Sequence, residues 1–145
     1  MKIQQTTLDS GVVVITERVA GLGSASIGIW VENGSRHEDG QVNGISHFYE
    51  HMVFKGTKNR DPIDIVRSIE SKGGYINAYT TRDHTCFYTR VVKEELGLAT
   101  EVLCDMVNEP LLLKEDFHKE KEVILEEVRA ALDNPEDIIH DIFAE

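Results

Sequence analysis

The pentapeptide His47-Phe48-Tyr49-Glu50-His51 constrains the fold of this chain more than any other segment. It lies within residues 44–54, where the apolar positions recur with a helical period. Histidines four residues apart lie on one face of a helix, about one turn from each other, as a tetrahedral metal ion requires of two ligands. The chain must therefore fold so that a second element brings a further ligand to this helix face.

The glutamate of the pentapeptide, Glu50, lies three residues after His47 and so beside the same face. A carboxylate in this place can accept a proton from water held at a metal ion without being a ligand itself. The order H-x-x-E-H is the reverse of the zinc motif H-E-x-x-H and is a known zinc motif in its own right. The alternative is a solvated helix face that holds two histidines by chance. The rest of the helix argues against this alternative, because a separate face is predicted to do the packing and leaves the histidine face free for chemistry. The packing face consists of Ile45, Phe48, Tyr49 and Met52, and the other face carries His47, Glu50, His51 and Phe54.

The third ligand is predicted in the helix over residues 114–134. Glu120 and Glu127 fall seven residues apart within its apolar stripe, and a buried carboxylate is costly unless a cation or hydrogen bonds compensate it. We assign Glu127 as the third zinc ligand and Glu120 as the acid that orients a ligating histidine. Two alternatives stay open: both glutamates reach solvent at the edge of the stripe, or Glu126, about 100° away around the helix, is the ligand. The stripe itself consists of Phe117, Ile124, Val128 and Ala131.

The order of the predicted elements indicates an α+β fold, with a mainly antiparallel sheet and helices packed on one face. Short turns, such as the one at residues 82–84, join consecutive strands as hairpins. Trp30 is expected in the core, and Cys86 and Cys104 are expected there as reduced thiols. The predicted strands cover residues 2–8, 12–17, 24–31, 75–81 and 85–92; the further helices run from Pro62 to the glycines at 73 and 74 and over residues 93–108, 114–134 and 136–145.

Charge and composition exclude several classes of function. The 145 residues carry 15 basic and 26 acidic side chains, a formal net charge of −11, which repels nucleic acid and anionic lipid. The start of the chain is too polar for a secretory signal, and no run reaches the roughly 20 apolar residues of a membrane span, so we expect a cytoplasmic protein. Two cysteines without a C-x-x-C pair indicate neither a disulfide framework nor a thiolate zinc site. A metal ion and a cationic peptide are the partners that this charge favours.

The sequence from Gly44 to Thr57, GISHFYEHMVFKGT, resembles the signature of the pitrilysin or insulinase family of zinc metallopeptidases, and most of all its bacterial relatives of the mitochondrial processing peptidase β subunit. The resemblance implies an endopeptidase with one Zn²⁺ per chain, Glu50 as general base and Glu127 as the distant ligand, with Glu120 as the family's additional acid. Residues 73–81 are similar to the family's edge strand, where an extended substrate peptide adds to the sheet. That implies peptide docking along Asn77, Ala78 and Tyr79; the alternative for this segment is an ordinary central strand.

The resemblance also bears on the organisation of the protein. Family members are considerably longer and consist of an amino-terminal half and a related carboxy-terminal half that close around the substrate. We therefore expect residues 1–145 to be an incomplete amino-terminal metallopeptidase domain of a bacterial protein. Its expected partners are a peptide substrate and either the missing carboxy-terminal portion or a homologous subunit, with a homodimer as one arrangement. Alternative functions are a non-catalytic peptide-binding subunit, an inactive fragment, and an interaction domain whose zinc has a fourth protein ligand.

Overall fold

The fold is described from a computed structural model that covers residues 2–144, except the side chains of residues 137, 140–142 and 144. Within these residues no helix has both the length and the apolar character needed to cross a membrane. The predicted helix over residues 136–145 begins one residue earlier, at Pro135, and residue 145 lies outside the described part. The elements are β1 (Ile3–Thr7), β2 (Val13–Glu17), β3 (Ser24–Val31), α1 (Ile45–Met52), α2 (Pro62–Glu70), β4 (Tyr75–Thr80), β5 (Thr85–Val92), α3 (Leu96–Asn108), α4 (Lys114–Asp133) and α5 (Pro135–Ala144), with short 3₁₀ turns at Ser35–His37, Val53–Lys55 and Lys93–Glu95.

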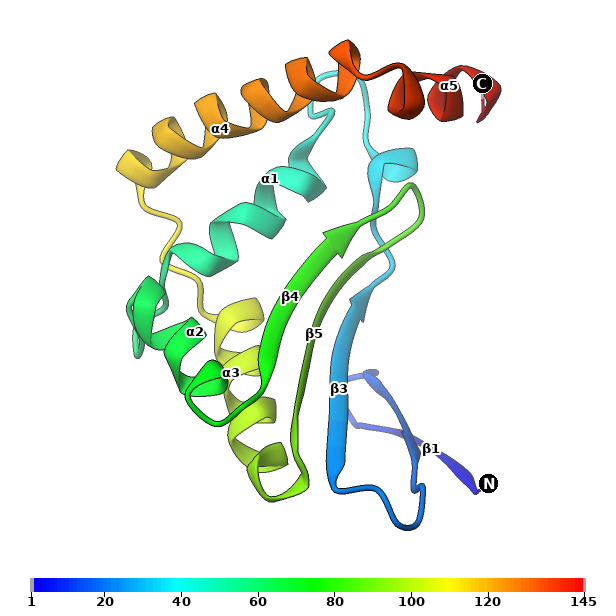
Figure 1. Ribbon diagram of the computed structural model, residues 1–145, viewed down its shortest axis with the longest axis vertical. Coiled ribbons are helices and arrows are strands. Elements are labelled where there is room, and N and C mark those ends of the chain that lie inside the picture. The colour runs from blue at the N-terminus through cyan, green and yellow to red at the C-terminus, as the bar shows by residue number, and fades with distance from the viewer. Residues whose placement is uncertain (1, 145) are drawn as a thin grey trace.

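The main sheet has three antiparallel strands in the order β3-β5-β4 (Figure 1). β5 lies in the centre, where Phe87 pairs with Ile29 of β3 and with Ala78 of β4. Strands β1 and β2 form a separate antiparallel hairpin. β4 is consequently an edge strand of the described sheet, not a central one.

Helices α1, α2 and α3 cover one face of this sheet (Figure 1). The alternation of β5 directs Phe87, Thr89 and Val91 toward the helices, and all three side chains are buried. The α+β fold with helices on one face, as predicted, is confirmed. The buried core consists of Val53, Ile65, Ile69, Phe87, Val91, Ala99, Val102, Leu103 and Met106.

Two predictions about the core, for Trp30 and Cys104, are wrong. Trp30 is 61% exposed, because Ile27 and Ile29 occupy the helix-facing positions of β3 and Trp30 alternates to the other side. Its ring lies against Gly28, where an added Cβ would come within 2.7 Å of it. Cys86 is buried as predicted, but Cys104 is exposed on α3.

Asp105 of α3 anchors the loop that follows α1. Its carboxylate accepts hydrogen bonds from Thr57 Oγ1, Asn59 Nδ2 and Arg60 Nη1, each at 2.7 Å. Burial raises the pKa of Asp105, but the hydrogen bonds from Thr57, Asn59 and Arg60 outweigh burial and hold the pKa below its ordinary value. The folded protein therefore favours the ionised form of this side chain, and the loop is fixed on α3 next to the end of the histidine helix.

We expect Asp105→Asn to lower the free energy of unfolding by about 2–4 kcal/mol, since it removes the charge from a buried hydrogen-bonded network. Because the pKa of Asp105 is lower in the folded than in the unfolded protein, its contribution is complete above about pH 4 and is lost as the pH falls through the folded-state value. Urea unfolding between pH 2 and 7 measures this contribution. If Asp105→Asn and the wild type lose stability in parallel over that range, the network does not hold a charged Asp105.

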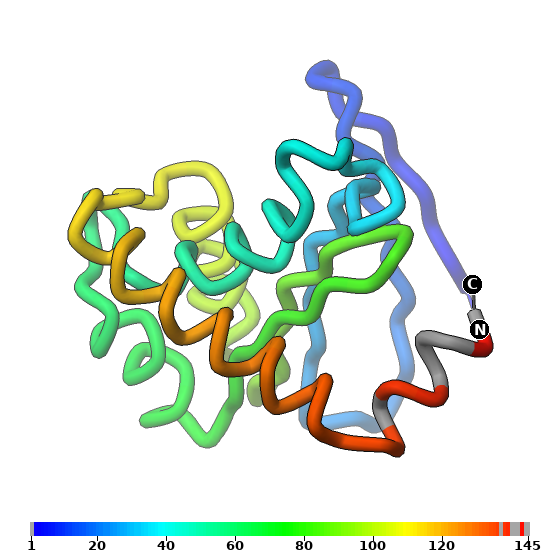
Figure 2. The backbone as a smooth tube through the Cα atoms, turned by 90° about the horizontal axis from the view of Figure 1, so that it is seen from above, coloured from blue at the N-terminus to red at the C-terminus, as the bar shows by residue number. Residues whose placement is uncertain are grey.

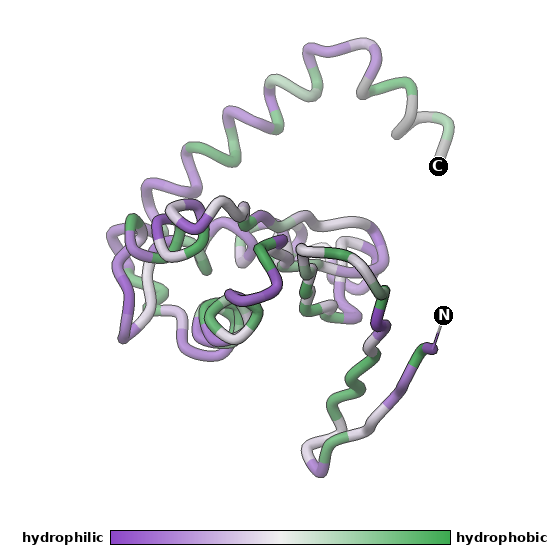
Figure 3. The backbone as a smooth tube through the Cα atoms, turned by 60° about the horizontal axis from the view of Figure 1, so that its bottom comes forward, coloured by the Kyte–Doolittle hydropathy of each residue, from purple (hydrophilic) through white to green (hydrophobic). Residues whose placement is uncertain are grey.

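Helix α4 lies across α1, and hydrophobic residues recur between hydrophilic ones along it (Figures 2 and 3). The rings of Phe48 and Phe117 meet at this crossing, with centroids 4.5 Å apart. α1 has 8 residues and α4 has 20, so their lengths are about 12 Å and 30 Å and α1 covers only part of α4. Glu120 is buried, whereas the Glu127 side chain is 49% exposed. The prediction that the stripe buries both glutamates is therefore wrong for Glu127.

Candidate metal centre

The start of α1 is fixed by an acid from the preceding loop. Glu38 accepts hydrogen bonds from the backbone N–H groups of Gly44, at 2.6 Å, and Ser46, at 2.8 Å. These N–H groups have no partner within the helix, and a negative charge at a helix N-terminus is favourable. Burial raises the pKa of Glu38, but its hydrogen bonds with Ser46 and Gly44 outweigh burial and lower the pKa. This contact sets the orientation of the turn that carries His47.

The two faces of α1 differ in part from the prediction. Met52 is buried, and the Tyr49 hydroxyl donates to the carbonyl oxygen of Val107 at 3.0 Å, so these residues form the packing face. Ile45, the first residue of α1, is 47% exposed and so is not part of the buried packing face. Phe54 packs against the core and not on the histidine face. The reason is that α1 ends at Met52 and continues as a tighter 3₁₀ turn, which rotates the next side chains.

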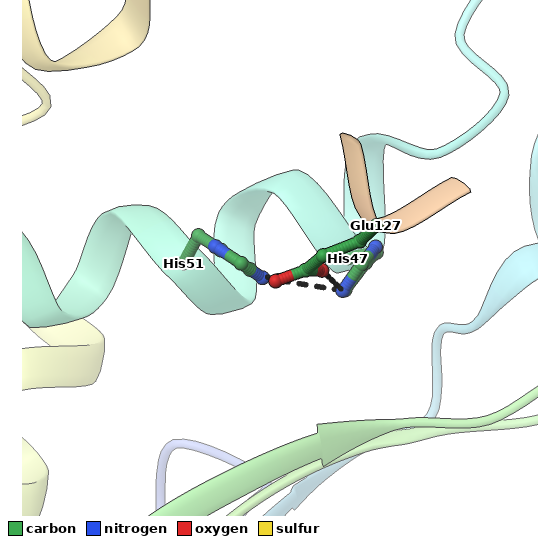
Figure 4. Close-up of side chains that lie close together, drawn as sticks. All are labelled: His47, His51 and Glu127. Carbon is green, nitrogen blue, oxygen red and sulfur yellow. Dashed lines mark hydrogen bonds and ion pairs between the residues drawn. The ribbon is translucent and has the colours of Figure 1, made fainter. Parts of the chain in front are cut away.

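The side chains of His47, His51 and Glu127 point toward one another (Figure 4). The Nε2 atoms of the two histidines are 3.2 Å apart, and Glu127 Oε2 lies 3.5 Å from each of them. In the described part of the chain, these three side chains form a group whose ligand atoms lie close enough together to hold one metal ion. The structure thus brings together, from two helices, the three side chains that the sequence suggests as ligands.

The separations of these three atoms can be compared with a metal geometry. Zinc binds imidazole nitrogen and carboxylate oxygen at about 2.0–2.2 Å, so two ligand atoms of a tetrahedral site lie roughly 3.3–3.5 Å apart. The observed distances of 3.2 and 3.5 Å agree with that value. The side chains of His47 and Glu127 are 38% and 49% exposed, so one side of the group is open to solvent. The residues present therefore fit a zinc ion with one position left for water.

Glu120 contacts one of the two histidines. His51 Nδ1 lies 3.1 Å from Glu120 Oε2, and Lys55 Nζ lies 2.6 Å from Glu120 Oε1. Burial raises the pKa of Glu120, but the hydrogen bonds from Lys55 and His51 outweigh burial and hold the pKa below its ordinary value. An ionised carboxylate only accepts hydrogen bonds, so His51 carries its proton on Nδ1. The other ring nitrogen of His51, Nε2, then faces His47 and Glu127.

We expect Glu120→Gln to weaken zinc binding by roughly 10–100-fold, because the amide no longer fixes the tautomer of His51 and no longer balances Lys55. Competition with a chromogenic chelator measures the zinc affinity. Glu122→Gln is the matched control, since it removes an exposed acid from the same helix. Equal zinc affinities for the two variants would show that Glu120 does not support a metal ligand.

The structure adds two contacts that the sequence did not suggest. Lys55 balances the charge of Glu120, and the Thr80 hydroxyl donates to Glu50 Oε2 at 2.6 Å. The sequence holds a signal only for Lys55, which follows His51 by four residues and so could reach the same side of the helix. Thr80 has no such signal, because its contact depends on how β4 packs against α1.

Residues 77–79 lie in the edge strand β4, next to α1. The backbone N–H of Ala78 is bonded to the Oδ1 atom of Asn77 at 2.9 Å and not to a neighbouring strand of the described sheet. Tyr79 is on the face away from the helices, where its ring meets Tyr88 with centroids 5.9 Å apart. The outer edge of β4 near the metal centre therefore has backbone groups that another extended segment can pair with.

The antiparallel sheet, the helices on one of its faces and the H-x-x-E-H helix facing a distant glutamate define an inverted zincin type of domain. The chain belongs to the family described as Insulinase (Peptidase family M16), whose model matches residues 13–145. It is 42% identical over 142 residues to an uncharacterized zinc protease of Streptomyces coelicolor, covering 98% of this chain and 31% of that protein. It is 38% identical over 136 residues to the human mitochondrial-processing peptidase subunit beta, covering 94% of this chain and 28% of that protein.

A solved structure agrees with the fold. The crystal structure of a protease from Helicobacter pylori superposes with a TM-score of 0.90 at 27% sequence identity, covering 94% of this chain and 33% of that one. The chain thus spans about a third of the length of the zinc protease and of the solved structure that it matches. The resemblance to the pitrilysin or insulinase family is confirmed, while the roles of the individual site residues stay predictions.

Proposed function

We propose that this chain is the metal-bearing part of a zinc-dependent endopeptidase, with one Zn²⁺ held by His47, His51 and Glu127. The observation that carries the proposal is the convergence of three ligand atoms within 3.5 Å of one another, although Glu127 follows the two histidines by 80 and 76 residues in the sequence. The exposed side of the group supports a catalytic rather than a structural zinc site, because a structural site closes the fourth position with a protein side chain. The names of the relatives, which are zinc proteases, point in the same direction.

Glu50 is the general base in this proposal. When bound, zinc supplies a Lewis acid that polarises a peptide carbonyl and increases the acidity of water. Glu50 takes the proton of the water that attacks the carbonyl and passes it to the departing amine. Glu120 holds the imidazole of His51 by its Nδ1–H group, so that the ring does not turn away during the reaction.

The outer edge of β4 is the proposed docking strand for the substrate. An extended peptide would pair along Asn77, Ala78 and Tyr79 and form hydrogen bonds with backbone groups such as the Ala78 N–H. In the structure, this N–H donates to the side-chain oxygen of Asn77 instead. Backbone pairing accepts many side-chain sequences, and the net charge of −11 favours cationic peptides. The rest of the protein, or a homologous subunit such as a second copy of this chain, would close over this edge. A cytoplasmic location in a bacterium stays a prediction of the sequence.

A cleavage assay on the complete protein tests the proposal. Unstructured peptides rich in lysine and arginine are incubated with the protein as purified, after treatment with a chelator, and after zinc is returned to the chelated sample. We expect cleavage in the first and third samples and none in the second. Binding of the peptides without cleavage in all three samples would contradict the proposal and would indicate a non-catalytic peptide-binding subunit.

A further inference from the structure

A general base must present one defined oxygen to the reacting water, so the Glu50 carboxylate needs a group that holds it in place. In the described part of the chain, the hydrogen bond from Thr80 Oγ1 to Glu50 Oε2, at 2.6 Å, is the only one made by this carboxylate. Such a length is typical of a hydroxyl that donates to a carboxylate oxygen. In the described residues, Thr80 thus forms a hydrogen bond with the proposed base and none with the three proposed metal ligands.

A second hydroxyl limits where the Thr80 proton can point. Thr85 Oγ1 lies 3.3 Å from Thr80 Oγ1 and donates its own proton to the carbonyl oxygen of Asn33 at 3.0 Å. Thr80 has one hydroxyl proton, and of its two neighbouring acceptors the Glu50 carboxylate oxygen, at 2.6 Å, is nearer than Thr85 Oγ1, at 3.3 Å. The β-branched side chain of Thr80 is stiff about χ1, and Thr85 behind it is buried. The donor is therefore directed at Glu50 before any substrate arrives.

We propose that Thr80 is a positioning residue for the general base, a role that rests on the proposed function. Its hydrogen bond holds Oε2 of Glu50 and leaves Oε1 as the oxygen that receives the proton of water. Thr80 directly follows residues 77–79, the proposed docking strand, and its side chain alternates to the helix-facing side of β4. Strand β4 thus aligns the substrate through its outer edge and the base through the side chain of Thr80. The positions of substrate and base are therefore fixed relative to each other.

The test compares Thr80→Val, which keeps the shape and removes the hydroxyl, with Thr80→Ser, which keeps the hydroxyl. In the complete protein we expect Thr80→Val to lower kcat by roughly 10–100-fold, with KM and zinc content unchanged, as is usual for residues that support an active group. Thr80→Ser should restore kcat to within about threefold of the wild type, on the same scale. Thr100→Val is the matched control, since its hydroxyl donates to the carbonyl oxygen of Leu96 within α3; it should leave kcat unchanged.

Two further readouts separate positioning from substrate binding and from stability. In the inactive Glu50→Gln background, addition of Thr80→Val should leave the dissociation constant of a peptide unchanged. A crystal structure of the Thr80→Val protein should show the Glu50 carboxylate in more than one conformer, with His47, His51 and Glu127 unmoved. A raised KM at unchanged kcat, or a wild-type kcat, would overturn the proposal. If neither the wild type nor any variant cleaves peptides, the proposed function fails. A single unchanged conformer of Glu50 in the Thr80→Val structure would overturn the positioning role independently of cleavage.

Discussion

We expect Glu50→Gln to lower the rate of peptide cleavage by about 10²–10⁴-fold while the protein keeps its zinc, because an amide accepts no proton from water. The substitution is nearly isosteric and leaves an acceptor for the Thr80 hydroxyl, so the side chain can stay in place. The measurement pairs kcat/KM on a peptide substrate with the zinc content of the same preparation.

The control for this experiment is the carboxylate of Glu70, at the end of α2, away from the proposed metal centre. Glu70→Gln removes the same charge and should cleave at the wild-type rate. Cleavage by Glu50→Gln at the wild-type rate contradicts the assignment of Glu50 as general base. Loss of zinc from Glu50→Gln contradicts it too, because it would place this carboxylate among the ligands.

We expect Glu127→Gln to lose zinc affinity by more than the roughly 10–100-fold that is typical of residues which only support a ligand. The reason is that the substitution replaces the charged oxygen that lies 3.5 Å from both histidine nitrogens with a neutral amide. Chelator competition gives the affinity, and cleavage should fall with zinc occupancy and return at high zinc concentration.

The neighbouring acid of α4 gives a matched control. Glu126 forms an ion pair with Arg129 on the exposed side of the helix, and Glu126→Gln removes the same charge one residue away. It should keep the zinc affinity of the wild type. The opposite result, with zinc lost from Glu126→Gln and retained by Glu127→Gln, would assign the ligand to Glu126, the alternative that the sequence leaves open.

The local patterns of the sequence predicted the elements well, because each has a local cause. Asp61 before Pro62 begins α2, and its side chain accepts the N–H of Asp64 as a helix cap should. α2 ends at Glu70, earlier than the glycines that follow it, since Gly73 takes up a positive φ of 75° in the turn to β4. The period of residues 44–54 gave the helix but not its change to a 3₁₀ turn at Val53.

The depth of each side chain was less predictable, because it depends on what covers an element. Trp30 has a large apolar side chain of the kind usually found in a core. It is exposed because the helices pack on the other side of the sheet. Glu120 and Glu127 have the same place in the stripe of α4, but only Glu120 lies where α1 and Lys55 enclose it. For the same reason the sequence suggested the candidate ligands by spacing, whereas the contact of Thr80 with Glu50 required the packing of β4 on α1.

Anomalous diffraction at the zinc absorption edge, from crystals of the complete protein, tests the central claim most directly. We predict one zinc peak per chain, about 2.0–2.2 Å from His47 Nε2, His51 Nε2 and a Glu127 carboxylate oxygen, with no fourth protein ligand. An empty site in crystals supplied with zinc, or a zinc ion whose fourth position is filled by another side chain, would contradict it.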